Sequence, residues 1–182
     1  MGFAFAAVFL WLARPTGPTM AASLLLVLPG LWLRAYASGY VRKNAELATT
    51  GPYARTRNPL YLGSMLIAFG FAAAAGSWLI LIALAVLFAA IYIPTIQSEE
   101  AYLRERFSAF DSYSRDVPRL LPRVRPARSN PTEGGFSVAL YRKNREYNSL
   151  VGAGAIYAVL ALKLLLERHA LHAGFSRPTW WS

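Results

Sequence analysis

The chain has 182 residues, of which 55% are hydrophobic, yet its formal net charge is +10. This length allows one domain, and the lack of cysteine excludes disulfides, a catalytic thiolate and cysteine-ligated zinc or iron–sulfur sites. Long apolar runs alternate with arginine-rich connectors, which is the pattern of a multi-pass membrane protein.

The apolar runs are taken in chain order against the roughly 20 helical residues that cross a hydrocarbon core of about 30 Å. The first run, residues 2–13, is short and would cross only with tilt or local thinning of the bilayer. The second, residues 18–40, has Pro29-Gly30 in its middle, where we expect a kink. The runs 59–75 and 77–97 are divided only by Gly76-Ser77, which predicts a tight helical hairpin.

The last apolar run covers residues 150–166, near whose end Lys163 and Glu167 are spaced to form an ion pair. Together the runs predict an all-α transmembrane bundle of about five spans, with the connectors forming any polar pocket. We expect a single membrane domain with four parts: N-terminal spans in 1–39, a core in 40–122, a basic connector in 123–149, and a C-terminal span and tail in 150–182.

Most of the 19 Lys and Arg residues fall in two connectors, residues 41–58 and 98–149. Excess Lys and Arg marks the cytoplasmic side, so the N-terminus and these connectors are predicted inside and the C-terminus outside. The arginines border apolar spans and form no nucleic-acid-binding motif, so membrane lipids are the expected partners and nucleic acid is not.

Few residues could support metal or ion chemistry. His169 and His172 are the two histidines, and with no carboxylate nearby beyond Glu167 we predict no metal site. Arg34 and Lys163 are the charged residues inside the apolar runs, which is too few for an ion path.

Two connector segments carry more information. In the first, Gly51-Pro52 indicates a turn, and Asn58-Pro59 predicts an N-cap followed by proline at the first helical position. In the second, we expect the span to continue into a short helix that opens with Glu99 and Glu100. Acids at a helix start either complement the helix dipole or, at the mouth of a cavity, suit a cationic ligand.

The order of these motifs resembles a known family. Gly51-Pro52-Tyr53, the run from Arg57 to Tyr61, a hairpin, Glu99-Glu100 followed by Leu103, and the run from Val117 to Pro122 are similar to the isoprenylcysteine carboxyl methyltransferases and the related phospholipid methyltransferases. The resemblance covers roughly residues 40–122.

The resemblance implies that S-adenosyl-L-methionine binds between the hairpin helices and the cytoplasmic connectors, and that a lipophilic substrate enters from the bilayer. Glu99 would hold the ammonium group of the cofactor, and the rings of Tyr53 and Tyr61 would face its sulfonium. Glu100 would act as the base if the acceptor is an amine. The residues carried over as cofactor-binding are Glu46, Leu47, Ala48, Tyr53, Asn58, Pro59, Leu60, Tyr61 and Glu99.

Three positions depart from the family pattern. Asn58 stands where histidine is usual, and Ser108 replaces a glycine. Thr95 stands where prenylcysteine-methylating members have an arginine that engages the substrate carboxylate, so carboxyl methylation is doubtful. Two other functions stay open: an NADPH-dependent membrane reductase of related architecture, and a non-catalytic membrane scaffold.

Overall fold

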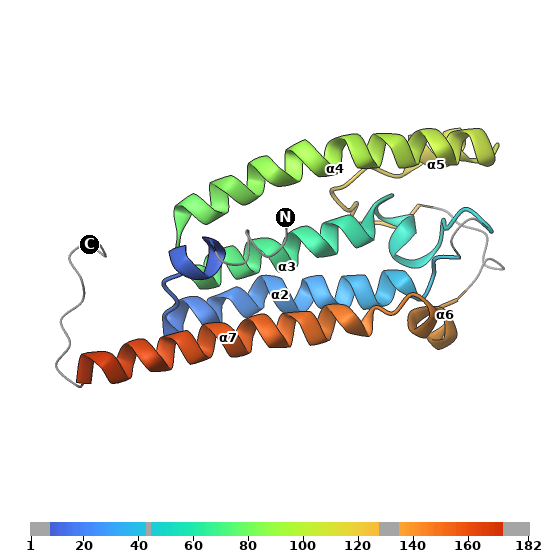
Figure 1. The fold of residues 1–182 in the computed structure, drawn as a ribbon. Helices are drawn as coiled ribbons and strands as arrows, with labels where there is room; N and C mark the ends of the chain where they lie inside the picture. The colour runs from blue at the N-terminus through green and yellow to red at the C-terminus, as the bar shows by residue number, and fades with distance from the viewer. Residues whose placement is uncertain (1–7, 43–44, 128–134, 173–182) are drawn as a thin grey trace.

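The computed structural model describes residues 8–42, 45–127 and 135–172, with side chains to residue 169, and these residues form helices and loops without a β-strand (Figure 1). The all-α prediction is therefore confirmed. The elements are α2 (Gly17–Ser38), the 3-10 helix η1 (Gly51–Ala54), α3 (Pro59–Ala75), α4 (Trp78–Arg106), α5 (Phe110–Asp116), α6 (Val138–Lys143) and α7 (Tyr147–His172).

Within the described ranges, three helices are long and apolar enough to cross a membrane: α2, α4 and the Tyr147–His169 part of α7. The shorter α3 has 17 residues, which is about 26 Å of helix and close to the lower limit for a span. Large apolar side chains on the outer faces, such as Leu25, Trp32 and Val86, are exposed, as lipid-facing residues are. The chain is thus a multi-pass membrane protein.

The first of the five expected spans, residues 2–13, is only partly tested because residues 1–7 lie outside the described ones. Residues 8–12 are helical and lie beside the α3–α4 hairpin, where the backbone N–H of Arg14 donates to Ala75 O at 2.6 Å. Lys163 links α7 to residues 8–13, because its ammonium group donates to Leu10 O and Ala13 O, both at 2.6 Å. Its predicted ion pair with Glu167 is also present, at 3.9 Å.

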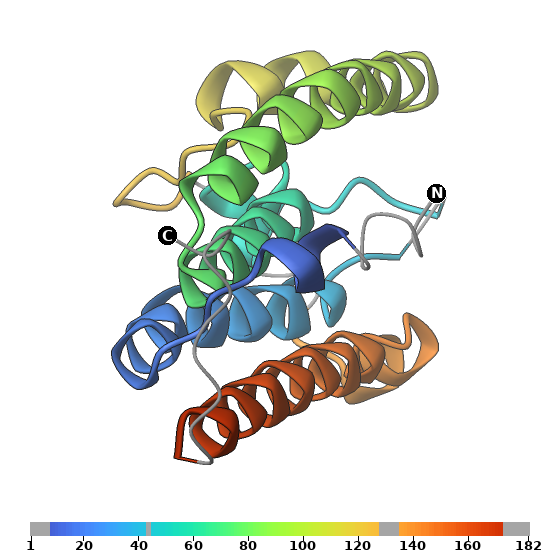
Figure 2. The same cartoon turned by 60° about the vertical axis from the view of Figure 1, so that its left-hand side comes forward.

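The helices lie in the order α4, α3, α2, α7 across the molecule, as Figures 1 and 2 show from two directions. The hairpin that joins α3 and α4 lies at one end, and η1, α5 and α6 lie at the other. The arginine-rich connectors therefore share one end, as the charge pattern predicted. Which side of the membrane that end faces stays a prediction.

The boundary between α2 and α3 depends on glycine. A Cβ added to Gly30 would come within 2.8 Å of the Gly63 carbonyl oxygen, and one added to Gly63 would come within 2.9 Å of the Gly30 oxygen. Small residues that let two backbones approach are typical of membrane helix pairs. Helix α2 runs unbroken through Pro29, and Gly30 serves close packing; the kink expected there stays a prediction.

Helix α4 differs from its prediction. We expected the span to end near residue 97, with Glu99 and Glu100 opening a separate short helix, but one helix continues from Trp78 through Pro94 to Arg106. The two acids lie in its last third and are not complements of a helix N-terminus. Because neighbouring residues on a helix point about 100° apart, the two carboxylates face different surroundings.

The α2–α3 contact gives a test of the packing. Gly30→Ala should lower the free energy of unfolding by about 1–3 kcal/mol, because the added methyl group meets backbone atoms that cannot move aside cheaply. Gly152→Ala on α7 is the matched control, since a Cβ there meets nothing within 4 Å. Thermal unfolding of the detergent-purified variants measures both, and equal effects would contradict the close packing.

Candidate functional site

The site at the connector end begins with a clasp between two loops, residues 54–58 before α3 and residues 117–127 after α5. Backbone hydrogen bonds join them: Arg57 N–H to Pro118 O at 2.9 Å, Arg123 N–H to Arg55 O at 3.0 Å, and Ala127 N–H to Ala54 O at 2.8 Å. The hydroxyl of buried Thr56 adds a bond to Leu120 O at 2.9 Å. The two segments picked out of the sequence are therefore held against each other.

Glu100 of α4 lies behind this clasp with 7% of its surface exposed. Its carboxylate accepts two hydrogen bonds from the Arg119 guanidinium, at 3.1 and 2.7 Å, and forms an ion pair with Arg57 at 3.4 Å. The adjacent carboxylate raises the pKa of Arg119 above its ordinary value. Both oxygens of Glu100 are thus occupied by arginines from the two clasped loops.

A cavity of about 550 Å³ opens between the clasp, α3 and α4. The structure brings every residue predicted for the site to this one cavity. Its lining includes Glu46, Leu47, Ala48, Tyr53, Asn58, Pro59, Leu60, Tyr61, Glu99 and Glu100. Their individual roles stay predictions.

Glu99 and Tyr61 face each other across the cavity. The Tyr61 hydroxyl donates to the Glu99 carboxylate at 2.8 Å, and the Tyr61 ring packs edge-to-face on Tyr92 with centroids 4.9 Å apart. Glu99 is exposed, in contrast to its buried neighbour Glu100. One carboxylate is therefore oriented by a tyrosine and still open to a ligand.

Tyr53 comes from η1, which Gly51 allows to form by taking a φ of 58°. The side chain is 7% exposed, and burial raises the pKa of its phenol. The Tyr113 hydroxyl donates to the Tyr53 carbonyl at 2.8 Å, and burial raises the pKa of that phenol as well. Both phenols therefore stay neutral throughout the physiological pH range.

Asn58 and Glu46 differ in how firmly they are held. Asn58 occupies the N-cap position, but its side chain makes no capping bond and donates instead to Arg119 O at 2.8 Å, which corrects the predicted role as a cap. Pro59 stands at the helix start as predicted. Glu46 pairs with exposed Arg42 at 3.2 Å on the rim, a surface contact that contributes little stability.

Sequence reasoning missed several lining residues, among them Arg34, Tyr92, Tyr113 and Glu146. The sequence could have indicated Arg34, because an ionisable residue inside an apolar run is a candidate functional group. Arg57 also lines the cavity. Its Nε is buried and has no hydrogen-bond partner among the described protein atoms.

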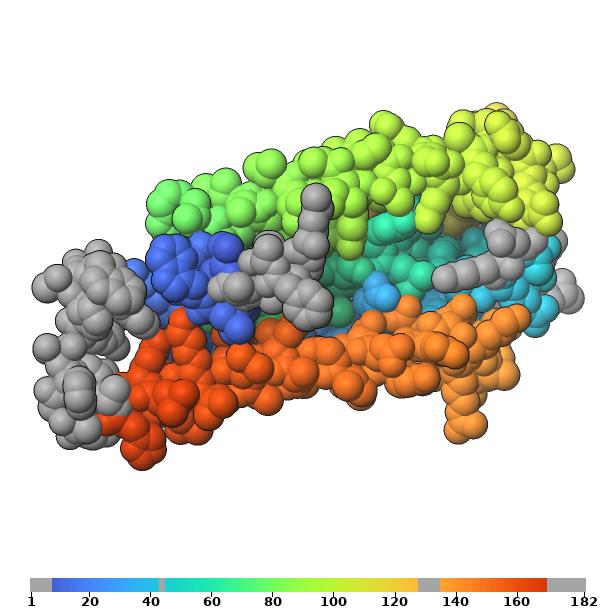
Figure 3. All heavy atoms as spheres, in the orientation of Figure 1, coloured from blue at the N-terminus to red at the C-terminus, as the bar shows by residue number. Residues whose placement is uncertain are grey.

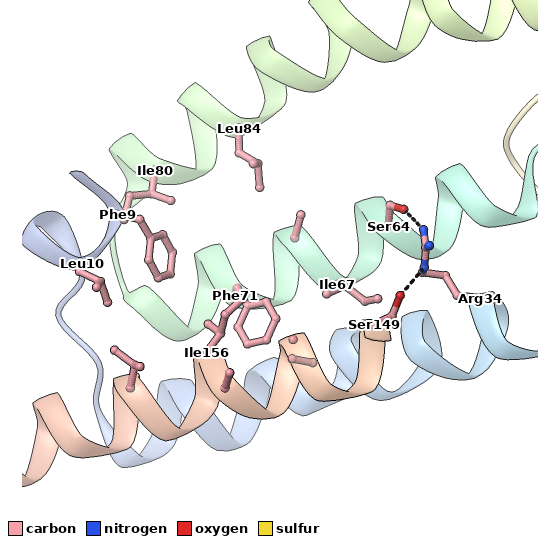
Figure 4. A pocket seen from close by; sticks show the side chains of 15 residues that line it. Phe9, Leu10, Arg34, Ser64, Ile67, Phe71, Ile80, Leu84, Ser149 and Ile156 are labelled. Atoms are coloured by element: carbon pink, nitrogen blue, oxygen red, sulfur yellow. Dashed lines mark hydrogen bonds between the residues drawn. The ribbon is translucent and has the colours of Figure 1, made fainter. Parts of the chain in front are cut away.

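A second cavity, of about 600 Å³, lies among the apolar segments of the helices (Figure 4). Apolar side chains of α3, α4 and α7 line most of it, including Phe71, Ile80, Leu84 and Ile156. In the space-filling view a hollow runs between α4 and α7, with α3 as its floor (Figure 3). The two cavities have Arg34 and Ser64 in common.

The adjacent acids give a test of this geometry. Glu100→Gln should lower the free energy of unfolding by about 1–3 kcal/mol, because it weakens a buried pairing with two guanidinium groups. Glu99→Gln, one residue away and exposed, should leave stability nearly unchanged. Denaturant or thermal unfolding distinguishes them. A Glu100→Gln protein that is as stable as the wild type would contradict the buried pairing.

Within the described residues, no group of three His, Asp or Glu side chains is placed to hold a metal ion. The chain has relatives among curated proteins, and two of them are named for resistance to metals. It is 40% identical over 102 residues to the nickel-cobalt-cadmium resistance protein NccN of Alcaligenes xylosoxydans xylosoxydans, a match covering 56% of this chain and 47% of that protein. It is 37% identical over 102 residues to the cobalt-zinc-cadmium resistance protein CzcN of Cupriavidus metallidurans, covering 56% and 46%.

The chain thus spans about half the length of these curated relatives. No solved structure matches it. A family model does match: that of the phospholipid methyltransferases, over residues 30–109. That segment includes all of α3 and α4, the C-terminal part of α2 from residue 30, and all ten predicted site residues. The predicted resemblance is therefore confirmed over residues 30–109, the segment that matches the phospholipid methyltransferase model.

Proposed function

We propose that the chain transfers a methyl group from S-adenosyl-L-methionine to a lipophilic acceptor that reaches it from the bilayer. The observation that carries the proposal is the shared cavity. Residues 46–48, 53, 58–61 and 99–100, chosen from the sequence, line one cavity at the connector end although they come from separate segments. The match to phospholipid methyltransferases covers all of them.

The residues of this cavity fit the charged groups of the cofactor. Glu99, oriented by Tyr61, offers a carboxylate to its ammonium group. The unpartnered Nε of Arg57 offers a donor to its carboxylate. The rings of Tyr53, Tyr61 and Tyr92 provide faces for a sulfonium, a contact of about 0.5–2 kcal/mol. A volume of about 550 Å³ lies within the roughly 300–1,000 Å³ of small-molecule sites.

The protein contributes position more than acid–base chemistry in this function. When bound, the cofactor supplies a methyl group on an activated, positively charged sulfur. Holding donor and acceptor in line removes about 7–11 kcal/mol of the barrier, and the clasp, Glu99 and Arg57 serve that purpose. In this proposal Glu100 keeps Arg57 in place and takes no proton, because both its oxygens are already engaged by arginines.

In this proposal the lipophilic acceptor binds in the apolar cavity. It meets the polar cavity at Arg34 and Ser64, so a molecule that lies among the apolar side chains can present a polar group toward the donor site. A nicotinamide dinucleotide fits less well. Three of the four acids that line the cavity are paired with arginines, so its unpaired charge is that of Glu99, which would repel a pyrophosphate.

Ligand-induced thermal stabilisation of the detergent-purified protein tests the donor. S-adenosylhomocysteine at 100 times its dissociation constant should stabilise the protein by about 2.7 kcal/mol, and NADPH should have no effect. Glu99→Gln should weaken this binding about tenfold, since it removes one charge-assisted hydrogen bond. Glu105→Gln is the matched control, because Glu105 is exposed on the same helix and does not line the cavity. Stabilisation by NADPH without S-adenosylhomocysteine would overturn the proposal.

A further inference from the structure

Arg34 lies at the boundary between the two cavities. It projects from α2 in the middle of the bundle, and its side chain is 22% exposed. Figure 4 shows it at the end of the apolar cavity opposite Phe9 and Leu10, with Ser64 and Ser149 on either side. Every other side chain that lines the apolar cavity is uncharged.

The guanidinium of Arg34 holds three helices together. It donates to both carboxylate oxygens of Glu146, at 3.1 and 2.9 Å, and to the Ser149 hydroxyl at 3.1 Å. It also donates to the Ser64 hydroxyl and to Leu60 O of α3. Each nitrogen of the Arg34 guanidinium thus has at least one acceptor, and the charged one is a carboxylate.

The ion pair presents different charges to the two cavities. Glu146 lines the polar cavity but not the apolar one, whereas Arg34, Ser64 and Ser149 line the apolar cavity. A molecule among the apolar side chains therefore meets a cation and two hydroxyl groups. Such a set of donors suits an anionic group and repels an amine cation.

The turn that delivers Glu146 is held in an uncommon conformation. Arg145 has a φ of 54°, a left-handed backbone that costs a residue other than glycine free energy. The side chain of Asn144 secures the turn by donating to Ser38 O at 2.9 Å. The two side chains of the pair are 22% and 10% exposed, and ion pairs withdrawn from water seldom add stability over an apolar pair of similar size.

We propose that Arg34 selects the acceptor, by binding an anionic group of the lipophilic molecule that fills the apolar cavity, and that Glu146 occupies Arg34 until this anion displaces it. The inference rests on the proposed function, since it assigns the polar end of the acceptor site. The anion is a carboxylate or a phosphate, and the test distinguishes the two.

Retention of labelled probes by the purified full chain tests the proposal. Oleate, oleyl phosphate and oleyl alcohol have the same hydrocarbon chain, so differences between them report the head group. The wild-type protein should retain at least one anion about tenfold better than the alcohol. Glu146→Gln should increase anion retention, because the internal competitor for Arg34 is lost.

Arg34→Gln combined with Glu146→Gln removes both charges and leaves no buried charge unpaired, so this double variant should remain folded. It should retain anions and the alcohol equally. Arg104→Gln is the matched control and should keep the preference, because Arg104 pairs with exposed Asp111 and lines neither cavity. Equal retention by the wild-type protein, or a preference that survives in the double variant, would overturn the proposal.

Binding of S-adenosylhomocysteine to the same samples separates this inference from the proposed function. Selective retention of an anion by a protein that does not bind S-adenosylhomocysteine would support the role of Arg34 and contradict methyl transfer. Binding of S-adenosylhomocysteine without any preference for an anion would do the reverse.

Discussion

The pairing of Glu100 with Arg57 and Arg119 is the interaction on which the connector end depends. A carboxylate with so little exposure needs partners, and it takes them from two loops that are distant in sequence. The pair of contacts fixes the rotation of α4 about its axis, because only one side of that helix can face the clasp. The next residue back, Glu99, is thereby turned toward the cavity and Tyr61.

The molecule joins two environments of opposite character. The connector end offers acids, arginines and phenols to a charged ligand, and the bundle offers apolar side chains to a lipophilic one. Arg34 and Ser64 line both cavities, so the polar and the apolar environment adjoin at these two side chains. This arrangement fits a reaction between a water-borne donor and a membrane-borne acceptor, as proposed.

Local signals predicted α3 well, and long-range contacts account for what was missed. Pro59 at its start and Gly76, in a left-handed conformation at its end, mark the observed bounds of α3. The end of α4 was predicted wrongly. The helix continues through Pro94 and past the end of the apolar run to Arg106. The side chain of Asn58 bonds Arg119 O, and Arg34 bonds Glu146, across 61 and 112 positions of sequence. Spacing along the chain cannot reveal such pairs, whereas the family resemblance did indicate residues that share the polar cavity.

The wall that α7 gives to the apolar cavity has small side chains at Gly152, Ala153 and Ala155. A Cβ added at position 152 would meet no neighbouring atom within 4 Å, so a side chain can begin there without displacing another helix. In the proposed function, the length of hydrocarbon accommodated would therefore change by substitution on one turn of α7, while Glu99 and the clasp stay as they are. Chain-length preference and donor affinity would then be separable traits of this architecture.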